Sequence, residues 1–253
     1  MVACAVYQVA EFRNSILSMP VIVLSCCASK KAESDFIWKG KVVSFLANPD
    51  QTDPRQAHPD HIVPNEKRTY REYVDIYNQM PQGAHGFQLL EASALYKPEV
   101  YQKLAKDFDH FYIFSAGWGI VRKNFRLPVY DITFSQRASA DNQRKWERGW
   151  NWNNDKESRI SDFNHIKEDV SAGIIPADEE IHFAGGHDYQ VPFLNLISAV
   201  PNKVNLWFKG NKIPVIDPVF EKRISACEFN TRRRTNWHYE WSEKLLSGKL
   251  LLR

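Results

Sequence analysis

Side chains able to bind or transform a ligand gather in three stretches, each directly after a short apolar run. The runs 21–24, 111–114 and 181–184 are rich in β-branched and aromatic residues, which is typical of buried strands. Open α/β sheets bind ligands outside the carboxyl ends of their strands, so we expect the three stretches to line one cleft. We assign a substrate site there to Ser25, Cys26, Lys30, Lys31, Ser115, Gly117, Trp118, Gly119, Tyr130, Gly186 and His187.

The central stretch, 115–119, reads Ser-Ala-Gly-Trp-Gly. Its two glycines allow a tight turn and let a ligand come close to the backbone. Pro128 and Tyr130 then lead to Asp131, which places an acid beside a tyrosine. This pattern indicates the floor of a site. The alternative is an ordinary strand-to-loop turn with a buried tryptophan.

Small residues and then two lysines, Lys30 and Lys31, follow the first apolar run. Backbone N–H groups, hydroxyls and ammonium groups that converge at a strand end form an anion cradle. The alternative is a polar turn with solvated lysines, because the spacing does not match the phosphate-loop pattern.

Two segments combine basic and aromatic residues. The first, 136–160, carries Trp146 and Trp150 at a spacing that places them on one helix face among several arginines. The second, 222–253, holds eight Lys and Arg residues against three acids. Indole rings among cations stack on unpaired bases, and basic clusters bind polyanions. The alternatives are tryptophans that seal the core and a solvated basic surface. We assign DNA contacts to Arg144, Trp146, Arg148, Trp150, Arg232, Arg233, Arg234, Asn236 and His238.

The composition is that of a soluble globular protein, with 43% hydrophobic and 25% charged residues and a net charge of +3. No apolar run approaches the ~20 residues of a membrane span, and no secretory signal is evident. The four cysteines match neither a disulfide framework nor a zinc spacing. The segment 58–61, His-Pro-Asp-His, is interpreted as a loop that shapes a pocket rather than a metal site. We expect a reduced, cytoplasmic protein without a metal, a cofactor, a membrane association or an obligate protein partner.

The elements that must position these residues form one α/β domain over 1–253, with a central, largely parallel sheet flanked by helices. The segment 136–160 is a Trp-rich polar insert in it, and 222–253 is a basic C-terminal segment. Further strands are expected at 42–46 and, at the sheet edge, 204–208. Helices are expected at 70–80, after Pro98, after an N-cap at Ser161 or Asp162, at 191–200 and at 241–251.

Three motifs together resemble the YaaA-like superfamily. They are Leu24-Ser25-Cys26-Cys27 with Lys30-Lys31, Phe114-Ser115-Ala116-Gly117-Trp118-Gly119-Ile120-Val121 with the later Pro128 and Tyr130-Asp131, and Ala184-Gly185-Gly186-His187-Asp188-Tyr189. The resemblance covers roughly residues 21–135 and 181–197, and the second motif is the most specific. The long loop at 47–65, the Trp-rich insert and the basic segment depart from the small members, so the substrate does not follow from the resemblance.

The resemblance implies an α/β fold that binds DNA. In length and basic-aromatic additions, the chain is similar to anti-phage DNA glycosylases that remove glucosylated hydroxymethylcytosine. Cleavage of an N-glycosidic bond passes through an oxocarbenium-like transition state, which a carboxylate stabilises. The expected catalytic residues are Asp131 first, then Asp162 and Asp188, with Asn164, His187 and His238 as donors to the departing base. Two alternatives stay open, a non-catalytic DNA-binding stress protein and an N-glycosidase that acts on free modified nucleotides.

Overall fold

A seven-stranded sheet is the centre of the molecule, and its strand order is β10-β7-β6-β1-β11-β12-β13. The computed structural model describes residues 20–26, 36–38, 40–81, 88–145, 162–210, 216 and 221–252. All neighbouring strands are parallel except the β6-β7 pair. The sheet consists of β1 (Val21–Ser25), β6 (Phe111–Ser115), β7 (Gly119–Arg122), β10 (Phe163–Asn164), β11 (Ile181–Ala184), β12 (Val204–Phe208) and β13 (Ile224–Glu228).

The three strands predicted to carry the site lie side by side at the middle of this sheet. β1 pairs with β6 on one side, with Ile22 opposite Phe111, and with β11 on the other, with Val21 opposite Ile181. Every residue of the three strands is buried, because helices cover both faces of a parallel sheet. The predicted fold, a largely parallel sheet flanked by helices, is therefore confirmed.

The far edge of the sheet differs from the prediction. The strand at 204–208 is present as β12, but β13 pairs with it and forms the edge instead. In β13 the residues after Ile224 are mostly exposed, so the segment lacks the apolar pattern that indicates a strand. The predicted basic segment at 222–253 thus contains a strand and a helix of the main fold.

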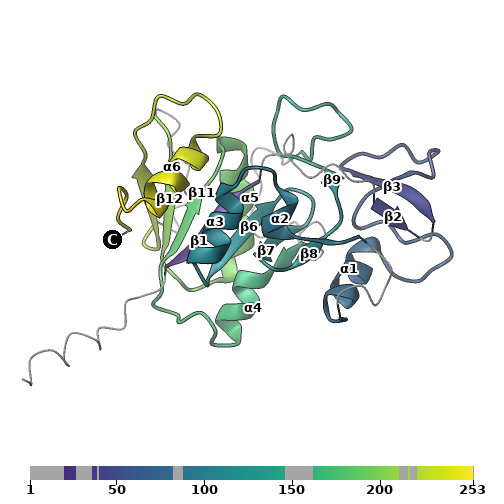
Figure 1. The fold of residues 1–253 in the computed structure, drawn as a ribbon, viewed down its shortest axis with the longest axis horizontal. Helices are drawn as coiled ribbons and strands as arrows, with labels where there is room; N and C mark the ends of the chain where they lie inside the picture. Colours follow the sequence, from purple (N-terminus) through teal and green to yellow (C-terminus); the bar gives the residue numbers. More distant parts are fainter. Residues whose placement is uncertain are drawn as a thin grey trace, which may run out of the picture.

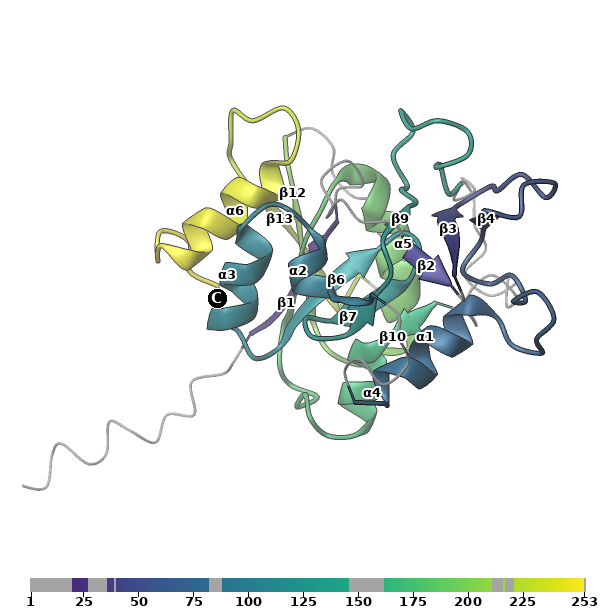
Figure 2. The same ribbon diagram turned by 45° about the vertical axis from the view of Figure 1, so that its right-hand side comes forward.

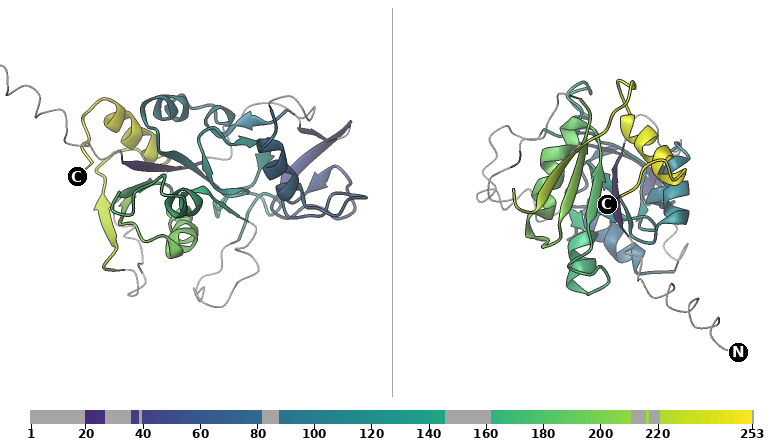
Figure 3. Two further views of the ribbon diagram at one scale, coloured as in Figure 1. Left: turned by 90° about the horizontal axis from the view of Figure 1, so that it is seen from below. Right: turned by 90° about the vertical axis from the view of Figure 1, so that its left-hand side faces the viewer.

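Helices cover the sheet in two layers (Figure 3): α3 and α6 lie on one face, α4 and α5 on the other. α5 begins directly after Gly186, four residues before the predicted start. The terminal helix is likewise shifted toward the N-terminus by four residues. The bounds are α1 (Tyr70–Asn78), α2 (Ala92–Leu95), α3 (Val100–Asp107), α4 (His165–Ser171), α5 (His187–Leu196), the 3-10 helix η2 (Ile197–Ala199) and α6 (Trp237–Leu246).

A smaller sheet lies at the opposite end of the molecule from α6 (Figures 1 and 2). The strand predicted at 42–46 belongs to it as β3, which pairs with β2 in an antiparallel hairpin and with β4 and β9 in parallel. Phe45 of β3 packs against Trp118 at a ring distance of 5.4 Å. One hydrophobic core therefore joins both sheets, which is consistent with a single domain. The smaller strands are β2 (Phe36–Trp38), β3 (Lys41–Leu46), β4 (Gln56–Ala57) and β9 (Tyr130–Asp131), with a separate pair β5 (Leu90–Glu91) and β8 (Arg126–Leu127).

Candidate functional site at the carboxyl edge of the sheet

The ends of β1, β6 and β11 converge, as the sequence predicts. The N–H of Cys26 donates to Phe114 O at 3.1 Å, and the N–H of Gly186 donates to Ser25 Oγ at 3.2 Å. At Gly185, a Cβ atom would lie 2.8 Å from the side chain of Ser25, so only glycine permits this approach of β11 to β1. The strand ends are thus joined by direct hydrogen bonds.

A buried network of hydroxyl groups and one thiol lies against these ends. Ser115 Oγ donates to the hydroxyl of Tyr130 at 2.6 Å, and Cys26 Sγ lies 3.4 Å from the same hydroxyl. Tyr96 also hydrogen-bonds to Tyr130, and the Tyr189 hydroxyl lies 3.9 Å from Cys26 Sγ. Burial raises the pKa of Tyr96 and Tyr130 well above the usual value, so both phenols stay neutral. Tyr96 and Tyr189 were not predicted, because nothing in their local sequence marks them as neighbours of Cys26.

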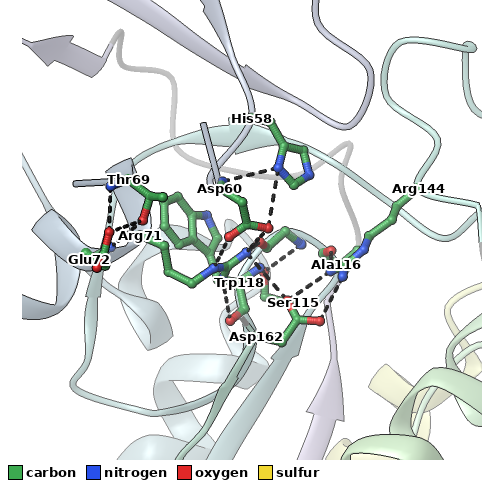
Figure 4. Close-up of polar contacts among 11 residues, drawn as sticks. His58, Asp60, Thr69, Arg71, Glu72, Ser115, Ala116, Trp118, Arg144 and Asp162 are labelled. Atoms are coloured by element: carbon green, nitrogen blue, oxygen red, sulfur yellow. Dashed lines mark hydrogen bonds and ion pairs between the residues drawn. The ribbon is translucent and has the colours of Figure 1, made fainter. Parts of the chain in front are cut away.

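Two arginines from distant segments hold the turn between β6 and β7 (Figure 4). Arg71 donates to the carbonyl oxygens of Gly117 and Trp118 at 2.9 and 3.0 Å, and Arg144 donates to that of Ala116 at 2.8 Å. The N–H groups of Gly117 and Trp118 in turn donate to Ser115 Oγ. Every peptide group in the middle of this turn is therefore fixed by a hydrogen bond.

Asp162 forms ion pairs with both arginines, and Asp60 supplies the second negative charge to Arg71. Its carboxylate accepts two hydrogen bonds from Arg144, at 3.0 and 2.8 Å, and lies 3.5 Å from Arg71. Its side chain is only 2% exposed. The predicted DNA contact of Arg144 is therefore corrected: its guanidinium is used inside the protein. Asp162, a predicted catalytic residue, likewise has its charge compensated within the fold.

Asn164 is the N-cap of α4, in place of the predicted Ser161 or Asp162. Its Oδ1 accepts from the N–H of Lys167 at 3.1 Å, and its Nδ2 donates to Leu196 O at 2.6 Å. Asp162 is unavailable as a cap because it pairs with the arginines, and Ser161 lies outside the described residues. Asn164, a predicted donor to the base, thus has both side-chain groups engaged by the backbone.

The segment 58–61 is joined to Arg71 and contributes two partly exposed polar side chains. Asp60 Oδ1 accepts from Arg71 Nε at 2.6 Å, and the N–H of Asp60 donates to His58 Nδ1 at 3.2 Å. The side chains of His58 and Asp60 are 21% and 29% exposed. Burial lowers the pKa of His58 to about 4; Asp60 raises it, while Arg144 and Arg71 lower it further. The loop was predicted to shape a pocket, but its link to Arg71, which follows from no local pattern, was missed.

Three predicted ligand-binding residues lie inside the fold. Trp118 is fully buried and stacks on Phe163 at 6.4 Å, so it is a core residue and does not stack on a base. Gly119 has a φ of +95°, and a Cβ there would lie 2.3 Å from the carbonyl oxygen of Phe163, so the close approach is to β10 and not to a ligand. His238 is buried in the first turn of α6 against Tyr239, which excludes the predicted DNA contact in this conformation.

Asp131 and Asp188 lie at different places. Asp131 is exposed on β9 and accepts a hydrogen bond from Asn142 Nδ2 at 2.5 Å. Successive side chains of a strand point to opposite faces, so Asp131 points away from the network that Tyr130 joins. Asp188 is half-buried in the first turn of α5, directly beyond the end of β11. Its neighbour His187 is exposed, with Nδ1 lying 3.2 Å from Gln190 Oε1.

The predicted basic cluster 232–234 follows β13 at the same carboxyl edge, and all three arginines are exposed. Arg233 forms ion pairs with Glu240 and Glu243, at 3.6 and 3.2 Å, and its carbonyl accepts from Lys209, which follows β12. Arg232 and Arg234 form no ion pair with any described residue. Asn236 is the N-cap of α6 with a φ of +52°, and its side chain makes no capping hydrogen bond.

Several predicted contacts fall outside the described residues, namely Lys30, Lys31, Trp146, Arg148 and Trp150. Within the described part of the chain, no three His, Cys, Asp or Glu side chains are grouped closely enough to hold a metal ion. None of the helices there has the length and apolar character needed to cross a membrane. Comparison of the chain with protein-family models, curated proteins and solved structures finds no match.

Proposed function

We propose that this protein is a DNA glycosylase that hydrolyses the N-glycosidic bond of a modified base, as a defence against phage. One observation carries the proposal: the order of chemical groups along the carboxyl edge. The hydroxyl network and the segment 58–61 lie at β6, Asp188 lies at the end of β11, and the exposed cations lie beyond β12 and β13. In this order, the groups at β6 would face the base, Asp188 would face the sugar, and the cations would face the phosphate of one nucleotide. The proposal places the protein in the cytoplasm, where phage DNA enters.

Asp188 is the carboxylate best placed to face the sugar. Of the three predicted aspartates, it alone is both partly exposed and directly beyond one of the three converging strands. As the C1′–N bond breaks, its electron pair moves to the base and positive charge develops on the sugar, which a carboxylate stabilises. Water then supplies the hydroxyl that bonds to C1′, and its proton ends on the base nitrogen.

The cations at the other end of the edge are suited to phosphates. Lys209 directly follows β12 and donates to the carbonyl of Arg233, so it lies beside the segment that carries Arg232 and Arg234. Cations grouped in this way bind a phosphate backbone without reading its sequence, and the binding weakens as salt rises. The base leaves its stack at a cost of a few kcal/mol, which these contacts help to offset.

The test is base release from duplex DNA that contains glucosylated hydroxymethylcytosine, with plain DNA as a control. We expect released base and abasic sites only with the modified duplex. Asp188→Asn should lower the single-turnover rate by a factor of about 1,000 or more while leaving the melting temperature and DNA affinity nearly unchanged.

Asp131→Asn is the matched control, because Asp131 is the other accessible aspartate that the sequence predicts. We expect it to keep most of the activity. A large loss with Asp131→Asn and none with Asp188→Asn would return the catalytic role to Asp131. DNA binding without base release from any duplex would leave the non-catalytic DNA-binding module as the function.

A further inference from the structure

We propose that His58 is a further catalytic residue of this site: its Nε2–H donates a hydrogen bond to the departing base, with Asp60 and Arg71 as positioning residues. This inference rests on the proposed function, since it assigns the group that stabilises the leaving base there. His58 and its loop precede β6 by about 50 residues in the chain, and Arg71 brings them to the turn that follows β6.

Hydrogen bonding fixes which nitrogen of His58 carries the proton. Nδ1 has two neighbours on Asp60, the backbone N–H, which donates to it at 3.2 Å, and the carboxylate Oδ2, which lies 3.5 Å away. The shorter N–H contact makes Nδ1 an acceptor, so the neutral ring carries its proton on Nε2. No residue in the described ranges hydrogen-bonds to Nε2, and the side chain is 21% exposed. His58 thus carries one N–H donor that no described residue uses.

The charge state of His58 suits a donor that keeps its proton. Its pKa of about 4, lowered mainly by burial, leaves the imidazole neutral at pH 7. A neutral imidazole N–H stabilises developing negative charge on a ligand without transferring its proton. In the cleavage step the base receives its proton from water, and the protonation state of His58 is the same before and after.

The position of His58 is rigidly defined (Figure 4). Arg71, which is 4% exposed, binds the Asp60 carboxylate at 2.6 Å and the turn after β6 with its other nitrogens. The N–H of Arg71 also donates to Pro59 O at 2.8 Å. α1 itself begins with a capping box in which Thr69 and Glu72 bond to each other's N–H groups. A donor held in this way is pre-organised for a transition state.

The distance across the edge suits a nucleoside. β1 lies between β6 and β11, so the end of β6, whose turn Arg71 binds, and the end of β11, which precedes Asp188, are two strand spacings apart, roughly 10 Å. A base near His58 and a sugar near Asp188 span this interval. The two side chains then act on opposite ends of the bond that breaks.

The first experiment measures contact and does not depend on catalysis. The probe is a duplex with one glucosylated hydroxymethylcytidine whose sugar carries a 2′-fluorine, which slows bond cleavage by destabilising the sugar cation. We expect the Nε2–H resonance of His58, assigned by its loss in His58→Gln, to shift on saturation with the probe. An unshifted resonance in the bound protein, or no binding of the probe, overturns the inference.

The second experiment compares rates on two leaving groups. His58→Phe should slow the single-turnover release of glucosylated hydroxymethylcytosine about 100-fold. For 5-fluorouracil, whose uncharged, electron-withdrawing fluorine stabilises the departing anion, the loss should shrink to about 10-fold. His58→Gln, which keeps an N–H donor near the same place, should recover part of the rate. His110→Gln, which replaces a partly buried histidine directly before β6 at the opposite end of that strand, is the control and should change the rate less than threefold.

The outcomes separate this inference from the proposed function. Equal losses on both bases, or a normal rate in His58→Phe, overturn the role of His58 and leave the glycosylase intact. A wild-type protein that releases neither base refutes the glycosylase, and the His58 resonance then still shows whether this side chain contacts the bound nucleotide. If His58→Phe fails to fold, the resonance and the Gln variant decide.

Discussion

Two groups of arginines lie at the same carboxyl edge of the sheet and differ in almost every physical respect. Arg71 and Arg144 are largely enclosed, and both bind backbone carbonyls of the turn after β6. Arg144 donates to the Asp162 carboxylate, whereas Arg71 donates to Asp60 and forms an ion pair with Asp162. The arginines of 232–234 are exposed, and only Arg233 has acidic partners among the described residues. A guanidinium stabilises the fold where carboxylates and carbonyls surround it, and it is available to a polyanion where they do not.

Removing one of the two enclosed arginines should change the stability of the protein more than any of the other substitutions. Arg71→Met removes the hydrogen bonds to Asp60 and to two carbonyls and one of the two ion partners of Asp162, so we expect a loss of about 3–5 kcal/mol in the free energy of unfolding. Urea unfolding measures it. Arg55→Ala, which breaks the exposed pair with Asp53, is the control and should barely move the midpoint. Equal midpoints for the two variants would show that enclosure does not matter here.

A buried histidine should likewise make the stability of the protein depend on pH. Burial lowers the pKa of His238 to about 3, whereas the unfolded chain titrates near 6.5, so stability is intact above pH 6.5 and falls as the pH drops toward 3. At pH 5 the low pKa of this histidine should lower the free energy of unfolding by about 2 kcal/mol relative to pH 7. Urea unfolding at pH 7 and pH 5 should therefore show a smaller acid-induced loss in His238→Phe than in the wild type. Identical losses would mean that His238 is protonated in the native state.

Substitutions in the exposed arginines of 232–234 should weaken DNA binding without changing the stability of the protein. Alanine at Arg232 and Arg234 should weaken DNA binding about tenfold at physiological salt and lower the slope of log affinity against log salt by about 2. Fluorescence anisotropy over a salt series measures both, and the melting temperature should stay the same. Arg55→Ala again serves as the control. An unchanged slope would identify the cluster as a solvated surface.

The smallest effect tests the revised role of Asn164. Asn164→Ala removes the N-cap of α4 and should cost about 1 kcal/mol of stability. Because both polar groups of Asn164 bind backbone, base release should be unaffected. A lost activity at unchanged stability would instead support the catalytic role that the sequence predicts.

The central strands were predictable because burial on both faces leaves an unbroken apolar run, as in Val21–Ser25 and Phe111–Ser115. β13 was not, because only Ile224 of that strand is buried. The site was predictable only at the strand ends. The pairs that join Asp60 to Arg71 and Arg144 to Asp162 depend on how distant segments pack, which no local spacing records.

The sequence also predicted wrong partners for some aromatic and basic residues, because their partners lie in distant segments of the chain. Trp118 lies among glycines and polar residues, which indicates a ligand contact, yet Phe45 and Phe163 enclose it. Arg144 belongs to a polar, basic segment, yet its guanidinium binds the buried carboxylate of Asp162. The identity of a side chain predicts which partners suit it, and the tertiary fold decides which of those partners it finds.

The hydrogen bonds from Arg71 and Arg144 to the turn after β6 also restrict how the two sheets can move relative to each other. They tie the α1 region, the loop before 146 and the β10 segment to one short piece of backbone, Ala116–Trp118. A hinge motion between the two sheets at this turn would first have to separate these charged groups from their partners. Under the proposed function, recognition would then consist of placing one extruded nucleotide against a preformed surface rather than of closing around it.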